Sequence, residues 1–523
     1  MKSPSKTNSN SELFLSISMI VLVFGGLFDA FYLTFEHFSG RIPPCTTGVF
    51  ADCGKVLTSP YAFILGIPIS VLGMLHYALL TVLMILSIVT LKQFIIRLAF
   101  VSSAIGFVFS LYFVFLQVVV IQALCQYCMV SALISFTLYF LVRIRFAEEY
   151  HTLMPKKVEI LYQLFGKPAF FLFDPEWVHD NAMRFGELFG KIPFIKSIFR
   201  FLFSYRHKSL EQNIQSVIFK NPVGLAAGYD YEAAFTQVLP SIGFGFETIG
   251  TMTHTPSEGN EKPRLGRLIK SKSLLVNKGF RNPGAKKIVS KLKSKSFEFP
   301  LGISIGVTNN SKISTFSDAI EDIMSTFTIF EKAKIKNSYY ELNISCPNLK
   351  TKVSFYDPKG LNQLLTAVSK IKLKKPLFIK MPIEKSDSEV MKMLTVIVKH
   401  SFVTGVIFGN LQKNRKDPAL LPEEVVQMGK GNFSGKPTFK RSNELISLAY
   451  KKYGKKLVII GCGGIFSPED AYIKIKAGAS LVQLITGMIF VGPQLITQIN
   501  RGLVEKLKND GYKHLSEAIG VDA

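Results

Sequence analysis

Four long apolar runs dominate the first part of the chain. They cover residues 13–35, 61–91, 94–124 and 129–144. Each is close to or longer than the roughly 20 residues that an α-helix needs to cross a bilayer. The pattern predicts an all-α bundle of four transmembrane helices in residues 1–146. A signal peptide is the alternative for the first run, but no small-residue cleavage site follows it, whereas further spans do.

The pattern changes after residue 146. Residues 148–157 are polar and contain Pro155, which is typical of a linker, and stretches rich in Phe and Leu follow at 158–173, 175–189 and 194–205. These stretches predict short amphipathic helices that lie on the bilayer surface. The alternative is that they are ordinary helices packed on the next domain. Residues 147–220 are therefore interpreted as a linker and a helical extension.

Short β-prone runs alternate with helical segments in residues 221–523. The predicted strands are 222–227, 246–251, 300–305, 339–344, 376–381, 405–408, 456–460 and 481–486. Eight such repeats predict an α/β fold, the (β/α)8 TIM barrel, in which the chemistry lies at the carboxyl ends of the strands.

Candidate chemical groups gather at these predicted strand ends. Asn343 and Asn348 offer amide donors and acceptors on either side of Cys346, which could transfer a proton or act as a nucleophile. Taken alone, the same residues also fit a turn with a buried structural thiol. Glycine-rich turns after strands seven and eight, ahead of helices, predict a phosphate cradle. Together with Lys380, these groups suit a flavin mononucleotide, FMN.

The charge is unevenly distributed between the two parts. The formal net charge is +25, but residues 1–150 hold eight basic and six acidic residues and contribute only +2. A basic soluble part tethered to a membrane fits attraction to anionic lipids or anionic substrates. Nucleic acid is not an expected partner, because no nucleic-acid-binding motif accompanies the charge.

Basic residues at the ends of the spans predict the orientation. Lys2 and Lys6 precede the first span, Lys92 and Arg97 lie between the second and third, and Arg143 and Arg145 end the fourth; Arg41 and Lys55 lie on the opposite side. By the positive-inside rule the N-terminus is cytoplasmic, and four spans return the chain to the cytoplasm. We expect a multi-pass protein of the cytoplasmic (inner) membrane with its barrel on the cytoplasmic side.

Four of the six cysteines then lie on the outer side. Cys45 and Cys53 are in the first outer loop, and Cys125 and Cys128 form a Cys-x-x-Cys motif at the start of the fourth span. A helix N-terminus favours thiolate, so this pair is suited to thiol–disulfide exchange with the other. Structural disulfides are the alternative. A metal site is less expected, because no nearby histidine completes a zinc site.

The membrane part resembles the bacterial type of the vitamin K epoxide reductase family. The resemblance rests on Cys45-x7-Cys53, Lys55-Val-Leu-Thr-Ser-Pro-Tyr61, Gly66-Ile-Pro68 and Cys125-x-x-Cys128. It implies a quinone, ubiquinone or menaquinone, held in the bundle beside Cys128, with Ser59 near it. Cys45 and Cys53 would be the shuttle pair that takes electrons from a thioredoxin-like partner. Many bacterial members carry that partner as a fused domain, and here it would be a separate protein on the outer side.

Residues 160–520 resemble the quinone-linked class of dihydroorotate dehydrogenases. The carriers are Asp174-Pro-Glu-x-x-His179, Asn221-Pro-Val-Gly-Leu-Ala-Ala-Gly228, Gly250-Thr-Met-Thr253, Lys262-Pro-Arg264, Asn343-Ile-Ser-Cys-Pro-Asn348, Phe433-Ser-Gly435 and Gly478-Ala-Ser-Leu-Val-Gln483. The resemblance implies FMN contacts at Ala226, Ala227, Gly228, Thr251, Asn343, Lys380, Gly435, Gly464, Thr486 and Gly487. It implies substrate contacts at Asn343, Asn348 and Asn410, with Arg267 near the quinone. The residue in the base position takes a proton from dihydroorotate while a hydride leaves for the flavin.

Several positions depart from that family pattern. The base is Cys346, where the quinone-linked class normally has serine, and a lysine expected near the substrate carboxylate is Tyr231. Val276 stands where the family has an asparagine, and Asn277 beside it is the candidate substrate contact. Ser304 stands where the family has an asparagine that faces the flavin. These changes affect the predicted substrate site more than the flavin site.

Three hypotheses follow from the sequence. The first is a bifunctional membrane oxidoreductase that oxidises dihydroorotate to orotate for pyrimidine (UMP) biosynthesis and oxidises thiols, with membrane quinone as the acceptor for both. The second keeps the thiol oxidase and gives the barrel a different ring substrate. The third makes the barrel a non-catalytic flavin-binding or scaffold module.

Overall fold

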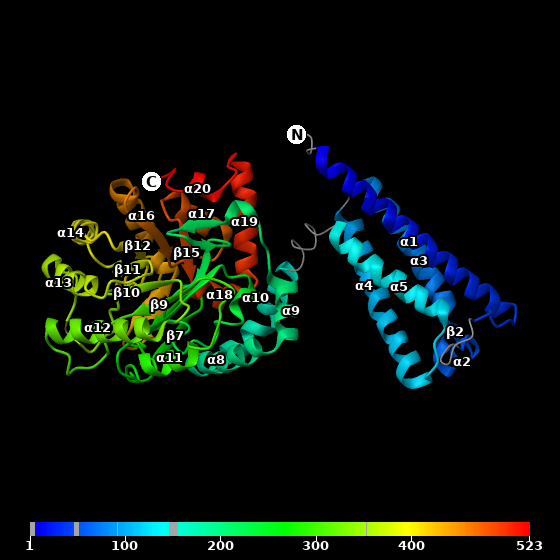
Figure 1. The fold of residues 1–523 in the computed structure, drawn as a ribbon, viewed down its shortest axis with the longest axis horizontal. Helices are drawn as coiled ribbons and strands as arrows, with labels where there is room; N and C mark the ends of the chain where they lie inside the picture. Colours follow the sequence, from blue (N-terminus) through cyan, green and yellow to red (C-terminus); the bar gives the residue numbers. More distant parts are fainter. Residues whose placement is uncertain (1–5, 46–51, 91–92, 146–154, 352) are drawn as a thin grey trace. The chain divides into compact units, whose positions relative to one another are not determined.

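The structure, a computed structural model, describes residues 6–45, 52–90, 93–145, 155–351 and 353–523. The chain divides into two compact units, Met1–Leu153 and Met154–Ala523 (Figure 1). Each unit has its own cluster of buried apolar side chains, so each has the core that defines a structural domain.

The first unit is built around four long helices. They are α1 (Lys6–Phe38), α3 (Ile69–Thr90), α4 (Gln93–Phe115) and α5 (Gln126–Arg145). All four are long and apolar enough to cross a membrane, as the hydrophobic pattern predicts. Large apolar side chains such as Phe28 and Leu133 are exposed on the outside of the bundle, which suits lipid as the surrounding solvent.

A close contact between α1 and α3 organises the bundle. A Cβ atom on Gly26 would lie 2.4 Å from the Tyr77 ring, so only glycine lets the two helices approach this closely. The Tyr77 hydroxyl donates to the Ser131 carbonyl oxygen at 2.9 Å and lies 2.8 Å from Ser135 Oγ. Tyr77 therefore links α1, α3 and α5.

The second and third apolar runs are not continuous α-helices. Pro60–Ala62 is a 3-10 turn, and β1 (Phe63–Ile64) pairs with β2 (Ile67–Pro68), so α3 begins only at Ile69. Leu65 and Gly66 have φ values of 51° and 80°, which close the tight turn of this ribbon. The third run ends in a π-helical turn, Leu116–Ile121. A short helix, α2 (Cys53–Leu57), completes the loop side of the unit.

The second unit begins with the helical extension. Its helices are η3 (Tyr162–Gly166), α7 (Lys167–Leu172), α8 (Pro175–Lys191) and α9 (Pro193–Phe203). Asp174 caps α8, because its carboxylate accepts from the backbone N–H groups of Glu176 and Trp177. The three predicted helical stretches are thus present, with boundaries set by Pro175 and Pro193.

One face of α8 packs on the barrel and the other is exposed. A Cβ on Gly186 would lie 2.5 Å from the Phe235 ring, whereas Trp177, Phe185 and Leu188 are about half exposed. The extension therefore combines the two interpretations of its sequence: it has a core-facing side and an apolar outer side.

Eight parallel strands close the barrel in the order β5-β6-β9-β10-β11-β12-β14-β15. They are β5 (Val223–Leu225), β6 (Phe246–Met252), β9 (Leu301–Ile305), β10 (Tyr339–Asn343), β11 (Leu377–Met381), β12 (Val403–Phe408), β14 (Val458–Cys462) and β15 (Leu481–Leu484). Each overlaps one predicted strand. Figure 1 shows helices surrounding this barrel; the longer ones are α11 (Ala285–Leu292), α12 (Phe316–Ala333), α13 (Pro358–Ser369), α14 (Asp387–Ile397), α16 (Phe439–Tyr453), α17 (Pro468–Lys476) and α19 (Leu495–Asn509).

Smaller elements complete the barrel unit. An antiparallel sheet with the order β13-β8-β7 is formed by β7 (Leu265–Leu268), β8 (Ser273–Val276) and β13 (Asn432–Gly435), and β3 (Gln212–Ile214) pairs with β4 (Val217–Phe219). The short helices are α10 (Leu239–Ile242), α15 (Pro422–Val426), α18 (Thr486–Val491) and α20 (Leu515–Ala518), with 3-10 turns at Lys208–Leu210 and Lys436–Thr438. None of these strands was expected from the sequence.

Large rings fill the barrel interior and small residues make room for them. A Cβ on Gly224 would lie 2.3 Å from the Phe246 ring, and one on Gly302 would lie 2.2 Å from the Tyr339 ring. Both rings are fully buried. This packing closes the interior beneath the strand ends that carry the candidate chemistry.

Candidate active sites

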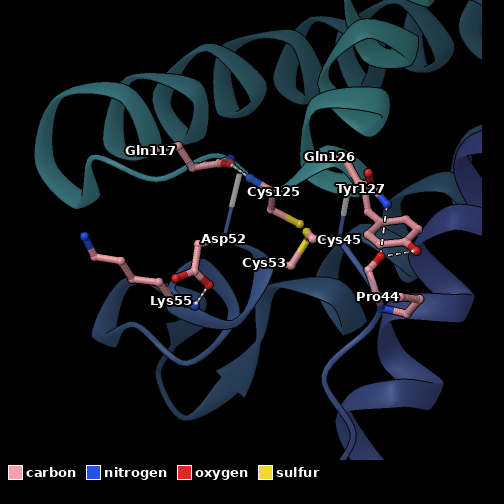
Figure 2. The surroundings of a disulfide bond; sticks show 9 residues. All are labelled: Pro44, Cys45, Asp52, Cys53, Lys55, Gln117, Cys125, Gln126 and Tyr127. Atoms are coloured by element: carbon pink, nitrogen blue, oxygen red, sulfur yellow. Dashed lines mark hydrogen bonds between the residues drawn. A yellow bond between two sulfur atoms is a disulfide. The ribbon is translucent and has the colours of Figure 1, made fainter. Parts of the chain in front are cut away.

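A disulfide joins Cys45 and Cys53 in the first unit, with Cα atoms 5.9 Å apart (Figure 2). Residues 46–51 between them lie outside the described part of the chain. The Asp52 carboxylate caps α2 by accepting from the Lys55 N–H at 2.8 Å. On the other side, Gln126 Nε2 and Tyr127 Oη both donate to the Pro44 carbonyl oxygen at 3.0 Å. The disulfide is thereby tied to the start of α5.

The Cys-x-x-Cys motif lies beside this disulfide. Cys125 directly precedes α5 and Cys128 is in its first turn, and both are free thiols. Cys125 shares a buried cluster with Cys53, and Figure 2 shows its side chain directed toward the disulfide. The Cys125 N–H donates to Gln117 Oε1 at 2.9 Å, which fixes the turn. One disulfide and one dithiol packed in the same buried cluster form an arrangement that can exchange electrons.

A large cavity lies on the bundle side of Cys128. Its volume is about 600 Å³, which is within the range of small-molecule sites, and most of its lining is apolar. Ser59 lines it, with its hydroxyl donating to the Val56 carbonyl oxygen at 2.8 Å. Asp29 and His76 also line it, and each has a buried polar atom without a hydrogen-bond partner in the described part of the chain. The sequence analysis did not identify these two, because each is one polar residue in an apolar run.

The second site is a cavity at the carboxyl ends of the barrel strands, with a volume of about 170 Å³. Nine residues predicted as site residues line it: Ala227, Gly228, Thr251, Asn343, Cys346, Asn348, Lys380, Asn410 and Thr486. They come from strands spread around the barrel, and closure of the sheet brings them together.

Hydrogen bonds fix the amides of this site. Asn343 Nδ2 donates to Thr251 Oγ1 at 2.8 Å, and its Oδ1 accepts from the Ser345 hydroxyl at 3.0 Å. Asn410 Nδ2 in turn donates to Ser345 Oγ at 2.6 Å. Asn348 donates to the Val276 carbonyl oxygen at 2.9 Å. The polar groups around the cavity are therefore held in place before any ligand binds.

A buried ion pair supports the floor of the site. Lys380 Nζ lies 3.8 Å from Glu341 Oε1, and both side chains are almost fully buried. Ser304 donates to the same Glu341 oxygen at 2.6 Å and lies 2.9 Å from Thr251 Oγ1. Ser304 itself does not line the cavity. Ser304 lies behind Thr251 and next to the partner of Lys380, and its predicted contact with a flavin stays a prediction.

The glycines predicted to hold a phosphate lie around the far end of this site. Gly435 has a φ of 81°, and Gly464 one of 73°, values that favour glycine. A Cβ on Gly487 would lie 1.9 Å from the Ile465 carbonyl oxygen. These close approaches bring together the loops after β13, β14 and β15. Neither these three glycines nor Ala226 line the described cavity.

The Cys346 thiol is the only thiol that lines this cavity in the described part of the chain. Burial raises its pKa to about 12, which outweighs the opposing effects of the Asn348 backbone N–H and the Lys380 charge. The thiol is therefore protonated at neutral pH, and only a small thiolate fraction can act as a base.

The segment 274–278 differs from the expectation. Leu274, Val276 and Lys278 line the cavity, whereas Asn277 does not, and its side-chain oxygen accepts from Asn260 Nδ2. Alternate residues of an extended segment point to opposite sides, which turns Asn277 away. Asn277 therefore does not join the other predicted site residues in this cavity, and its substrate contact stays a prediction. Lys278, which the sequence analysis did not select, is in the cavity instead.

Arg267 lies on β7 and contacts the extension. Its guanidinium donates to the carbonyl oxygens of Phe170, Phe171 and Phe173 at 2.7–3.2 Å. These carbonyls belong to the end of α7. Arg267 therefore holds the extension against the barrel, and its predicted place near a quinone stays a prediction.

Comparisons with known proteins match the two parts of the chain to two different families. Residues 209–507 match the family model described as dihydroorotate dehydrogenase, and residues 17–143 match the vitamin K epoxide reductase family. A dihydroorotate dehydrogenase (quinone) of Trichodesmium erythraeum is 36% identical over 66% of this chain and 94% of its own length. One from Christiangramia forsetii is 37% identical over 66% and 99%. The crystal structure of a DHODH from Eimeria tenella in complex with ferulenol has 27% identity and a TM-score of 0.58, covering 67% of this chain and 96% of that one.

Proposed function

The chain belongs to the dihydroorotate dehydrogenase family and carries an N-terminal vitamin K epoxide reductase family domain, and from this premise we propose that it is a bifunctional membrane oxidoreductase. Its barrel oxidises dihydroorotate to orotate, a step of pyrimidine biosynthesis. Its membrane unit oxidises the thiols of a separate protein. Both activities pass electrons to membrane quinone.

One observation carries the barrel activity. Cys346, Lys380 and the amides of Asn343, Asn348 and Asn410 come from different strand ends and line one cavity. A proton acceptor surrounded by amides suits a planar ring with carbonyl and N–H groups, such as dihydroorotate. The same set contains the buried cation Lys380, which can stabilise negative charge on an electron-accepting ring beside it.

The residues around the cavity fit FMN. Thr251, Asn343 and Lys380 offer two polar groups and one cation, all nearly fully buried. The loops of Gly435, Gly464 and Gly487 pack so closely on neighbouring protein atoms that a side chain there would collide, and the backbone N–H groups of such glycine-rich loops bind phosphate well. When bound, FMN supplies the hydride acceptor of the reaction and passes the electrons to quinone.

Cys346 supplies the base. Its thiolate takes the proton from C5 of dihydroorotate while the hydride leaves C6. Asn343, Asn348 and Asn410 orient the ring so that this proton faces the sulfur. Lys380 stabilises the negative charge that develops on the acceptor side. Asn343 and Lys380 are nearly fully buried, and electrostatic contacts are stronger at such sites than in water.

The membrane unit works by two disulfide exchanges. A partner dithiol reduces the Cys45–Cys53 disulfide and is itself oxidised. The resulting dithiol reduces a disulfide between Cys125 and Cys128, and that dithiol passes two electrons and two protons to quinone, forming quinol. The shared buried cluster of Cys53 and Cys125 and the position of Cys128 on the large cavity support this order.

The arrangement in the membrane follows from charge and apolar surface. Most of the basic residues that flank the spans lie on one side, which supports a protein of the inner membrane with its barrel in the cytoplasm and its cysteine pairs on the outer side. Trp177, Phe185 and Leu188 on the exposed face of α8 suit contact with lipid. Quinone would then approach the barrel through the extension, near Arg267.

The test is anaerobic titration of the purified protein with dihydroorotate. We expect a yellow protein whose flavin absorbance is bleached by about one equivalent of dihydroorotate and restored by a quinone. A flavin that dithionite reduces but dihydroorotate does not would reject the orotate activity. It would favour a different ring substrate, the second candidate, which the replacements at Tyr231 and Val276 leave open.

A further inference from the structure

A buried lysine without a carboxylate partner lies in the barrel cavity. The Lys278 side chain is 8% exposed, and it lines the same cavity as Cys346. Its ammonium makes one hydrogen bond in the described part of the chain, at 3.2 Å to His179 Nδ1. No carboxylate of the described residues lies within ion-pair distance of it. A buried cation normally has an anionic partner, and here the partner is missing.

The neighbouring carboxylates do not provide an anionic partner for Lys278. Glu176 Oε1 pairs with Arg264 at 3.0 Å and with Arg281 at 3.1 Å. Asp180 pairs with Arg281 at 3.1 Å. The cluster thus contains three cations, including Lys278, and two carboxylates that are already held by the arginines. When Lys278 is protonated, the cluster has one positive charge in excess, and Lys278 itself lines the cavity.

His179 orients the Lys278 ammonium. His179 Nε2 lies 2.9 Å from the Tyr229 carbonyl oxygen, which can only accept, so the proton is on Nε2. Burial and the nearby Lys278 lower the pKa of His179, which keeps the ring neutral. Nδ1 therefore offers a lone pair. The only proton of the Tyr231 hydroxyl goes to Asp180 at 2.8 Å, so Nδ1 accepts from Lys278.

Tyr231 supports the same cation from below. The Lys278 nitrogen lies 4.5 Å from the centre of the Tyr231 ring, and that ring stacks on His179 at 5.2 Å. Position 231 is the one at which the family resemblance leads to an expected lysine. The tyrosine there removes one cation and provides an aromatic surface for another that comes from the end of β8.

We infer that Lys278 binds the carboxylate of the substrate and replaces the cation that is absent at position 231. The ammonium has one donor occupied by His179 and two left for the carboxylate oxygens. An anion there would also neutralise the excess charge of the cluster. The inference rests on the proposed function, because it specifies which anionic ring the cavity binds.

The experiment measures orotate binding to the flavin-loaded full-length protein by the change in flavin absorbance. Lys278→Met removes the charge and keeps a similar length, and Lys278→Arg retains the charge. Lys287→Met, at an exposed position of α11, is the matched control. We expect the Kd for orotate to rise about 10- to 100-fold in Lys278→Met, to change less in Lys278→Arg and to stay the same in the control. Uracil, which lacks the carboxylate, should bind all four proteins alike.

A second measurement needs no variant. Burial lowers the pKa of Lys278 to about 7, against the opposing effects of Glu176 and Asp180. A carboxylate prefers the charged form, so orotate binding should be tightest below pH 7 and weaken by up to tenfold per pH unit above it. In the described part of the chain, the charged and titratable groups of this cluster and of the cavity lining are His179, Asp180, Glu176, Tyr229, Tyr231, Arg264, Arg281, Cys346 and Lys380. In Lys278→Met the Kd should lose this dependence, whereas in Lys278→Arg it should stay low at high pH.

The outcomes separate this inference from the proposed function. If the unmutated flavoprotein does not bind orotate, the proposed function fails and the inference with it. If it binds orotate but Lys278→Met binds as tightly as Lys287→Met, the inference alone is overturned. A Kd for orotate that is constant between pH 6 and 8.5 in the unmutated protein also overturns it, even if Lys278→Met does not retain flavin.

Discussion

The guanidinium of Arg267 lies over the ring of Phe171, with its Cζ atom 4.6 Å from the ring centre. The same group donates to three carbonyl oxygens at the end of α7. A cation at a helix C-terminus satisfies carbonyls that have no partner within the helix and interacts favourably with the helix dipole. One residue of β7 thus ties the end of α7 to the barrel.

We predict that Arg267→Met slows electron transfer to quinone but not reduction of the flavin. Loss of the charge-assisted hydrogen bonds costs about 1.5–3 kcal/mol at the contact, so the end of α7 should loosen. Stopped-flow absorbance measures the two half-reactions separately. Reoxidation by quinone should fall about tenfold or more while reduction by dihydroorotate stays unchanged. Arg184→Met, at an exposed position of α8, should change neither, and equal losses in both half-reactions would contradict the assignment.

The rate of flavin reduction should rise with pH. Because burial raises the pKa of Cys346 to about 12, the thiolate fraction grows about tenfold for each pH unit below that value. At saturating dihydroorotate, the limiting rate between pH 6 and 9 should follow this slope without a plateau. Saturation removes the effect of Lys278 on substrate affinity.

Variants at Cys346 provide the control for that profile. Cys346→Ala should lower the limiting rate by about 10²- to 10⁴-fold, as expected for loss of a general base. Cys462→Ala removes the other buried thiol of the barrel, which lies outside the cavity lining, and should keep the steep profile. A rate that is independent of pH in the unmutated protein would show that Cys346 is not the base in its thiolate form.

Much of the architecture could be predicted because the pattern that encodes it is local. A helix in lipid must be apolar along its whole length, so α1, α3, α4 and α5 are visible in the hydrophobic runs. Barrel strands are short, buried and repeated, so the residues at their ends, such as Asn343 and Lys380, could be assigned to one site. What failed is the part that depends on pairing between distant segments.

The sheet of β7, β8 and β13 is the clearest case. β13 and β8 are far apart in the sequence but pair with each other, with Phe433 opposite Leu275. No local sequence pattern near either strand predicts that pairing. If β8 is not known to be a strand, the sequence does not show that Leu274, Val276 and Lys278 face the same side. Residue type alone then favours Asn277 as the substrate contact. A shift of one residue along a strand exchanges its two faces, which is why the neighbouring lysine was missed.

The membrane unit should form a specific mixed disulfide. Cys53 and Cys125 belong to one buried cluster, and the double variant Cys45→Ser, Cys128→Ser leaves only this pair among the four cysteines of the membrane unit. We expect a Cys53–Cys125 disulfide, detected by mass spectrometry of peptides from unreduced protein. The variant Cys53→Ser, Cys128→Ser leaves Cys45 with Cys125 and should form much less.

Activity should follow the same relay. Cys128→Ala should stop quinone-dependent oxidation of a reduced thioredoxin-like protein, because Cys128 is the thiol that lines the large cavity. Reduction of the flavin by dihydroorotate should not change. Unaltered thiol oxidation in Cys128→Ala would mean that the four cysteines are structural.

The barrel interior should not tolerate a methyl group at Gly224. A Cβ there would lie 2.3 Å from the Phe246 ring, which itself packs edge-on against Phe219 at 5.2 Å. Neither ring can move without disturbing the other, so Gly224→Ala should destabilise the barrel by about 1–3 kcal/mol. Flavin fluorescence released on heating reports the loss as a lower apparent midpoint.

In Gly429→Ala the new methyl group has no neighbour within 4 Å, and the midpoint of this control variant should be unchanged. Because the collision is with a side chain, Gly224→Ala combined with Phe246→Leu should recover part of the stability. A Gly224→Ala protein that melts with the unmutated one would show that the interior is less tightly packed than these distances require.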